Sequence, residues 1–104
     1  MELKQLRYFL SVAELGSFSR AAVQLSVAQP ILSRQIRALE HDLNTELFYR
    51  NGRGIVLSEA GKLLETYAKE IVQTASKASF EIMAMKATST SGPKKKKRPL
   101  CQPP

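Results

Sequence analysis

The chain has 104 residues, of which 43% are hydrophobic, and it carries a formal net charge of +7. This length fits one small domain with extensions, and the apolar content is typical of a folded chain rather than a disordered one. A single cysteine excludes an intramolecular disulfide, and no run of about 18 apolar residues is available for a membrane span.

The positive charge is concentrated near the C-terminus. Residues 94–98 supply five positive charges, which leaves only +2 for the rest of the chain. This run can add salt-dependent, nonspecific attraction to phosphates. Specific recognition of a nucleic acid must therefore depend on where individual arginines lie in the body of the chain.

Residues 3–15 are predicted to form the first helix. Its apolar stripe consists of Leu6, Phe9, Leu10 and Ala13. Gly16 is expected to end this helix, because glycine readily takes the left-handed conformation found at helix C-termini.

A short second helix is predicted over residues 18–25, capped by Ser17 or Ser19. Its inner positions are Ala21, Ala22 and Leu25. Residues 26–28 form a turn, and Pro30 then lies in the first turn of a third helix, where its missing N–H costs nothing. Two helices joined by a three-residue turn, with small residues at their crossing, are typical of a helix-turn-helix.

The third helix is expected to run from Gln29 to Leu43, and Asn44 can close it. Its apolar face, at helical spacing, consists of Leu32, Ile36, Leu39 and Leu43. The opposite face presents Gln29, Ser33, Arg34 and Arg37, with Pro30 at its start. Gln and Arg side chains can read base edges in a DNA major groove. The alternative is an ordinary surface helix whose arginines are solvated. Near the end of this helix, Glu40 and Asp42 are expected to form solvated pairs with Arg37 within reach.

A two-stranded hairpin is predicted next. Residues 47–50 and 55–57 are β-prone, and the segment 51–54 between them has turn chemistry. A hairpin directly after a helix-turn-helix makes a wing. Arg50 and Arg53 flank its tip, where they could contact phosphates or a minor groove, or simply be solvated.

The last predicted helix covers residues 59–87, with Ser58 as its cap. A heptad-like seam along it consists of Leu64, Ala68, Ile71, Ala75, Ala78, Ile82 and Met85. This spacing indicates a dimer with a second copy of the chain, since so small a body cannot cover both faces of so long a helix. Leu63, Tyr67 and Val72 are expected to widen the stripe toward the core. The alternative is a helix that frays beyond about residue 76.

Several segments together resemble the N-terminal DNA-binding domain of the LysR-type transcriptional regulators. The matching segments are Leu6-Arg7-Tyr8-Phe9, Gly16-Ser17-Phe18-Ser19-Arg20-Ala21-Ala22, Gln29-Pro30, Leu32-Ser33-Arg34-Gln35-Ile36, Leu39-Glu40, Leu47-Phe48 with Arg50, and Leu57-Ser58-Glu59-Ala60-Gly61. The resemblance implies a mainly α fold, with a winged helix-turn-helix at residues 1–58 and a dimerising linker helix at 59–87. Residues 88–104 are then expected to form a disordered basic tail.

The resemblance also implies roles for individual residues. Gln29, Pro30, Ser33 and Arg34 fall at the major groove. Arg50 and Arg53 fall on the wing, and the phosphate contacts would come from Ser17, Ser19 and Arg37. Two departures from the family stand out. Ala28 replaces a Ser or Thr cap, a loss of about 1 kcal/mol, and no effector-binding domain follows, so the chain is expected to be a fragment that senses no small molecule.

The function expected from the resemblance is sequence-specific binding of double-stranded DNA by a homodimer that regulates transcription in a bacterial cytoplasm, at the nucleoid. No membrane, cofactor or metal is expected. One histidine and one cysteine without clustered carboxylates also provide no catalytic or metal-binding constellation, so an enzyme is not expected. The alternative is a fragment that only dimerises and thereby interferes with full-length regulators.

Overall fold

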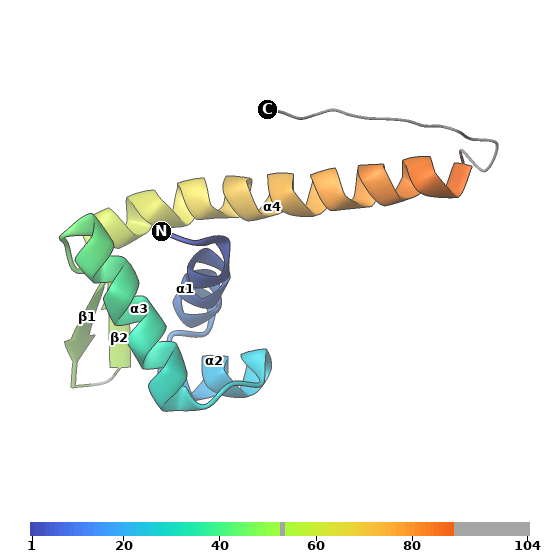
Figure 1. The fold of residues 1–104 in the computed structure, drawn as a ribbon. Helices are drawn as coiled ribbons and strands as arrows, with labels where there is room; N and C mark the ends of the chain where they lie inside the picture. The colour runs from blue at the N-terminus through green and yellow to red at the C-terminus, as the bar shows by residue number, and fades with distance from the viewer. Residues whose placement is uncertain (53, 89–104) are drawn as a thin grey trace. The chain divides into compact units, whose positions relative to one another are not determined.

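The structure is a computed structural model that describes residues 1–52 and 54–88 (Figure 1). Its elements are α1 (Leu3–Leu15), α2 (Phe18–Leu25), α3 (Gln29–Leu43), β1 (Phe48–Asn51), β2 (Gly54–Leu57) and α4 (Glu59–Thr88). The predicted limits of the first three helices are confirmed, and α4 ends one residue later than predicted. The chain forms two compact units, of which the first is Met1–Gln73 and the second begins at Thr74.

Side-chain caps explain where two of the helices begin. The Ser17 hydroxyl accepts a hydrogen bond from the Arg20 backbone N–H at 3.1 Å, so Ser17 rather than Ser19 caps α2. The Ser58 hydroxyl accepts one from the Gly61 N–H at 2.9 Å at the start of α4. Ala28 gives α3 no side-chain cap, as predicted.

Residues in the left-handed conformation end the first three helices. Gly16 has φ 65° after α1, and Asn44 has φ 56° after α3, both as predicted. Ser26 takes φ 59° at the end of α2, although the sequence carries no glycine or asparagine there. This conformation lets backbone N–H groups reach back to the last free carbonyls of each helix. The short turn after Ser26 then leads directly into α3.

The core lies among α1, α2, α3, the hairpin and the first half of α4. Its buried members are Leu6, Phe9, Val12, Ala21, Ala22, Leu32, Ile36, Leu39, Leu47, Phe48 and Ala68. Val12 is fully buried, whereas Leu10 and Ala13, which were predicted for the same face of α1, are only partly buried. Leu43 is 37% exposed, so its predicted burial is wrong: the core includes no residue of α3 after Leu39.

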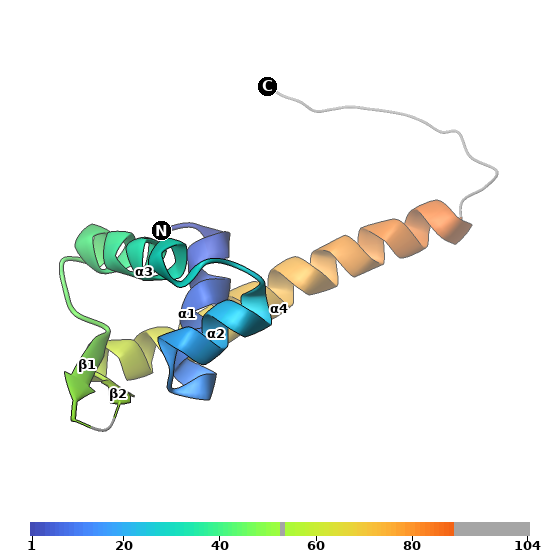
Figure 2. The same ribbon diagram turned by 90° about the horizontal axis from the view of Figure 1, so that it is seen from below.

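The hairpin forms next to α3, as predicted, with its first strand starting one residue later. The antiparallel strands pair Phe48 with Leu57 and Asn51 with Gly54. Phe48 points into the core, while Tyr49 and Arg50 are exposed. Figures 1 and 2 show that α2, the start of α3, the end of β1 and the start of β2 lie at the same end of the first unit. Arg53 lies outside the described residues.

The predicted seam of α4 needs correction within the first unit. Ala68 is 0% exposed in the core of its own chain, and Leu64 packs against that core, so Ala68 cannot meet a second chain. Leu63 and Tyr67, which were expected to face the core, are 62% and 55% exposed. Val72 packs on the core as expected. The helix is therefore rotated so that Leu64, Ala68 and Val72 face the core, while Leu63 and Tyr67 remain outside.

The described part of the second unit is the helical segment 74–88. Its large apolar side chains are exposed, and these are Phe80, Ile82, Met83 and Met85. Ala78 is also exposed, and Ala75 is half-buried. Among the described residues, no helix combines the length and apolarity that crossing a membrane requires. The predicted tail, including the basic run 94–98, lies outside the described residues.

Candidate nucleic-acid interface

The outer face of α3 carries a row of hydrogen-bond donors above a buried apolar face. Leu32, Ile36 and Leu39 are buried beneath it, with at most 2% exposure. Gln29 and Arg34 are exposed on the other side of the same helix. Because the buried side chains fix the rotation of α3, these two donors are held outward together.

Four more residues of α3 complete this face. Pro30 and Arg37 are exposed, as is Ile31, and Ser33 is half-buried. The Arg34 and Arg37 side chains make no hydrogen bond or ion pair with any residue in the described ranges 1–52 and 54–88. Two cations that pair with none of the described residues, projecting from one helix face, are suited to phosphates or base edges.

The two serines that were predicted as phosphate contacts have different surroundings. Ser17 is occupied with capping α2, as described above. The Ser19 hydroxyl instead donates a hydrogen bond to Oε1 of Gln29 at 3.0 Å, between two exposed side chains. This contact joins the beginning of α2 to the first residue of α3. Sequence reasoning missed it, because no local pattern connects residues ten positions apart.

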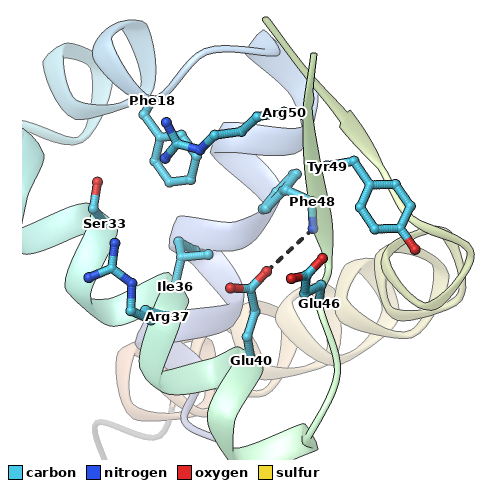
Figure 3. A pocket seen from close by; sticks show the side chains of 9 residues that line it. All are labelled: Phe18, Ser33, Ile36, Arg37, Glu40, Glu46, Phe48, Tyr49 and Arg50. Carbon is cyan, nitrogen blue, oxygen red and sulfur yellow. Dashed lines mark hydrogen bonds between the residues drawn. The ribbon is translucent and has the colours of Figure 1, made fainter.

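Arg50 is held at the edge of the hairpin by an aromatic ring. Its guanidinium carbon lies 5.2 Å from the centroid of the Phe18 ring, within the range of a cation–π contact. The Phe18 ring in turn packs edge-on against Phe48 at 5.9 Å, and Phe48 packs against Phe9 at 5.2 Å. The wing cation is thus anchored to the core through three rings. Figure 3 shows Arg50 lying over Phe18.

Residues 46–48, here called the wing base, are bound from two sides. The Glu40 carboxylate on α3 accepts hydrogen bonds from the backbone N–H of Leu47 at 2.8 Å and of Phe48 at 3.4 Å. Ser58, before α4, donates its hydroxyl to the Glu46 carbonyl at 2.6 Å and its N–H to the Leu47 carbonyl at 2.9 Å. The wing base thereby links α3 to the start of α4.

Glu40 was predicted to form a solvated pair with Arg37, and that prediction is wrong. Its carboxylate satisfies backbone N–H groups of the wing base instead. Asp42 pairs with the N-terminal ammonium of Met1 at 3.0 Å and also does not contact Arg37. In the sequence, the role of Glu40 is indicated only by its position near the end of the third helix, just before the hairpin.

A hollow between α3 and β1 brings several of these side chains together (Figure 3). Its lining residues are Phe18, Ser33, Ile36, Arg37, Glu40, Glu46, Phe48, Tyr49 and Arg50. Arg37 and Arg50 stand on the two elements that border it, one on the helix and one on the wing. Within residues 1–52 and 54–88, no group of three or more His, Cys, Asp or Glu side chains could hold a metal ion.

Comparison with known sequences identifies relatives of this arrangement. Residues 3–62 match the family described as bacterial regulatory helix-turn-helix protein, lysR family. The transcriptional regulator TfdT of Cupriavidus pinatubonensis is 46% identical over 72 residues, which make up 69% of this chain and 32% of TfdT. The regulator XapR of Escherichia coli is 47% identical over 74 residues, 71% of this chain and 25% of XapR. The chain thus spans about a quarter to a third of the length of these curated relatives.

Solved structures with this fold include several complexes with DNA. The CbnR DBD–DNA complex gives a TM-score of 0.76 at 42% identity, over 81% of this chain and 97% of that one. The BenM DBD complex with catB site 1 DNA gives a TM-score of 0.78 at 36% identity, over 85% of this chain and 97% of that one. The three helices, the wing and the long helix that follows are shared with these structures.

Proposed function

Because this chain belongs to the LysR family of bacterial regulatory helix-turn-helix proteins, we propose that it binds double-stranded DNA sequence-specifically and as a homodimer. Its winged helix-turn-helix is the DNA-binding part of such regulators, and regulation of transcription follows from occupancy of the site. A bacterial regulator meets its DNA in the cytoplasm, so the proposal places the chain there. The relatives named above are transcriptional regulators rather than enzymes.

The observation that carries the proposal is the exposed donor row of α3 above its buried leucines and isoleucine. An arginine fork matches the O6 and N7 acceptors of guanine, and a glutamine amide matches the N6 and N7 groups of adenine. We assign the major groove to Gln29, Pro30, Ser33 and Arg34. Major-groove reading by one exposed helix face is the usual mode of a helix-turn-helix.

The wing and the helix ends would supply backbone contacts. Arg50 is exposed and anchored over Phe18, so its guanidinium can meet a phosphate without first being ordered. Arg37, beside the hollow, has the same role on α3. Each phosphate neutralised in this way adds affinity that falls as salt concentration rises. Arg53 remains a predicted contact.

The dimer is proposed to form through α4. In the first unit, Ile71 is 39% exposed, and Leu63 and Tyr67 extend the apolar surface beside it. In the second unit, Ala78 and Ile82 are exposed. Large apolar side chains in water favour association. A two-fold protein would bind a pseudo-palindromic site with one half-site per chain.

Selection of bound sequences from a randomised duplex library tests this function. We expect a pseudo-palindromic site that is bound about 10³-fold or more tightly than a scrambled duplex of equal length at moderate salt. Light scattering on the same sample should give the mass of a dimer. Equal affinity for both duplexes, with a dimer present, would contradict the proposal. It would instead favour the alternative, in which the chain only pairs with longer relatives through α4.

A further inference from the structure

We propose that Ser19 orients the side-chain amide of Gln29 for base reading, which makes Ser19 a determinant of sequence specificity. The inference rests on the DNA binding proposed above and concerns one step of it. Ser19 is a positioning residue, because it acts through Gln29 and need not touch a base itself.

The geometry gives the contact a direction. The Ser19 hydroxyl donates to Oε1 of Gln29 at 3.0 Å. Since the amide group is planar, engaging its oxygen from the α2 side turns the Nε2 hydrogens to the opposite side of the group. Both side chains are exposed, and they come from the start of α2 and the first turn of α3. The contact therefore lies within the face of the molecule assigned to DNA.

Orientation matters because the two ends of a glutamine amide are chemically opposite. The oxygen accepts hydrogen bonds, whereas the nitrogen donates two. The terminal torsion of a free glutamine is broad and roughly two-fold, so an unsupported amide presents either end. Adenine offers a donor beside an acceptor in the major groove, while guanine offers two acceptors. If the amide is fixed before binding, only one of its two ends can meet the base. One of these two base patterns is then no longer matched.

The hydroxyl of Ser19 is free for this role because another residue performs the local one. Ser17 caps α2 by accepting the Arg20 N–H. Ser19 is the second residue of α2, and its hydroxyl takes no part in the cap. Removing this hydroxyl should therefore leave α2 folded and change only the surroundings of Gln29.

A direct phosphate contact is the competing role for Ser19, and the two roles leave different signatures. Phosphate contacts add affinity that is the same for every sequence. An orienting contact changes discrimination at one base position and leaves the others unchanged. Affinity for single-base variants of one duplex therefore separates the two roles.

The experiment uses the duplex selected by the wild-type chain and its single-base variants. The position read by Gln29 is the one at which Gln29→Ala loses discrimination. Dissociation constants are then measured for Ser19→Ala, Ser19→Thr and the double variant with Gln29→Ala. Ser79→Ala, an exposed helix position on α4, is the matched control for the serine-to-alanine change.

We expect Ser19→Ala to lose about fivefold in discrimination at that one position, the equivalent of one net hydrogen bond. Ser19→Thr should retain discrimination, because it keeps the hydroxyl. Adding Ser19→Ala to Gln29→Ala should change nothing further, and Ser79→Ala should match wild type.

Other outcomes would overturn the inference while leaving the proposed function in place. These are unchanged discrimination in Ser19→Ala, an equal loss of affinity for every duplex, or no position that depends on Gln29. A wild-type chain that selects no sequence would overturn the proposed function and this inference with it.

Discussion

Gly61→Ala is expected to lower the free energy of unfolding by about 3 kcal/mol, the upper end of the usual range for overpacking, where α4 meets the wing base. A Cβ at Gly61 would lie 2.2 Å from the Leu47 carbonyl oxygen and 2.8 Å from Cδ2 of Leu57. The carbonyl cannot easily turn aside, because it accepts the Ser58 N–H at 2.9 Å. Either α4 or the wing base must move.

The same substitution also raises helix propensity, but this gain is too small to offset the overpacking. Alanine is favoured over glycine inside a helix by about 1 kcal/mol. The net change should lower the melting temperature by about 10 °C for a chain of this size. Thermal unfolding followed by circular dichroism measures it directly.

Gly52→Ala is the matched control for the glycine substitution. Apart from Gly52 and its chain neighbours, no described residue has a heavy atom within 4 Å of a Cβ built at that position, so the melting temperature of Gly52→Ala should stay close to that of wild type. If Gly61→Ala proved as stable as Gly52→Ala, the close approach of α4 to the Leu47 carbonyl would be contradicted.

Glu40→Ala is expected to cost roughly 1.5–3 kcal/mol in the free energy of unfolding, the range for a hydrogen bond to a charged group. The carboxylate accepts the N–H groups of Leu47 and Phe48, and this contact is partly buried. Without it, both N–H groups lose their partner on α3, and the wing loses its alignment with that helix. Affinity for DNA should fall as well, because Arg50 follows the wing base in the chain.

Denaturant unfolding should be used to compare the free energies of unfolding of Glu40→Ala and Glu46→Ala. Glu46 is exposed and contributes only its backbone carbonyl to the wing base, so its side chain should be dispensable within about 0.5 kcal/mol. Glu40→Gln keeps an acceptor without the charge and should lie between the two. Equal stability of the two alanine variants would show that the carboxylate does not hold the wing.

The limits of the helices could be predicted because the signals for them are local. A glycine after α1, an asparagine after α3 and a serine before α4 each act on backbone groups within a few residues. The end of α2 had no such marker, yet Ser26 takes the left-handed conformation there. Its limit was still predicted, because the apolar spacing of α2 and the turn before Pro30 bracket it.

The facing of α4 could not be predicted from apolar spacing alone. Spacing identifies a wide stripe, but it does not say which part of the stripe meets the body. The close approach of Gly61 to the Leu47 carbonyl sets which side of α4 meets the body, and Ala68 is fully buried on that side. Leu64 and Val72 also pack on that side, whereas Leu63 and Tyr67 remain exposed.

The contacts that organise the candidate interface could also not be predicted from the sequence. The helical spacing of apolar residues predicts which side chains α3 exposes, and the exposure of Gln29 and Arg34 agrees with that prediction. The bond from Ser19 to Gln29 and the packing of Arg50 on Phe18 depend on how separate elements meet. No pattern in the chain encodes that meeting directly.

The exposed donors of α3 are proposed to read DNA bases, and Arg34→Ala tests this role most directly. Binding of the variant to the selected duplex and to a scrambled one should be measured beside wild type at one salt concentration. We predict a loss of about 1–3 kcal/mol for the selected duplex, with relaxed preference at one base position. A smaller loss for the scrambled duplex should accompany it. Unchanged affinity and preference in Arg34→Ala would contradict the account.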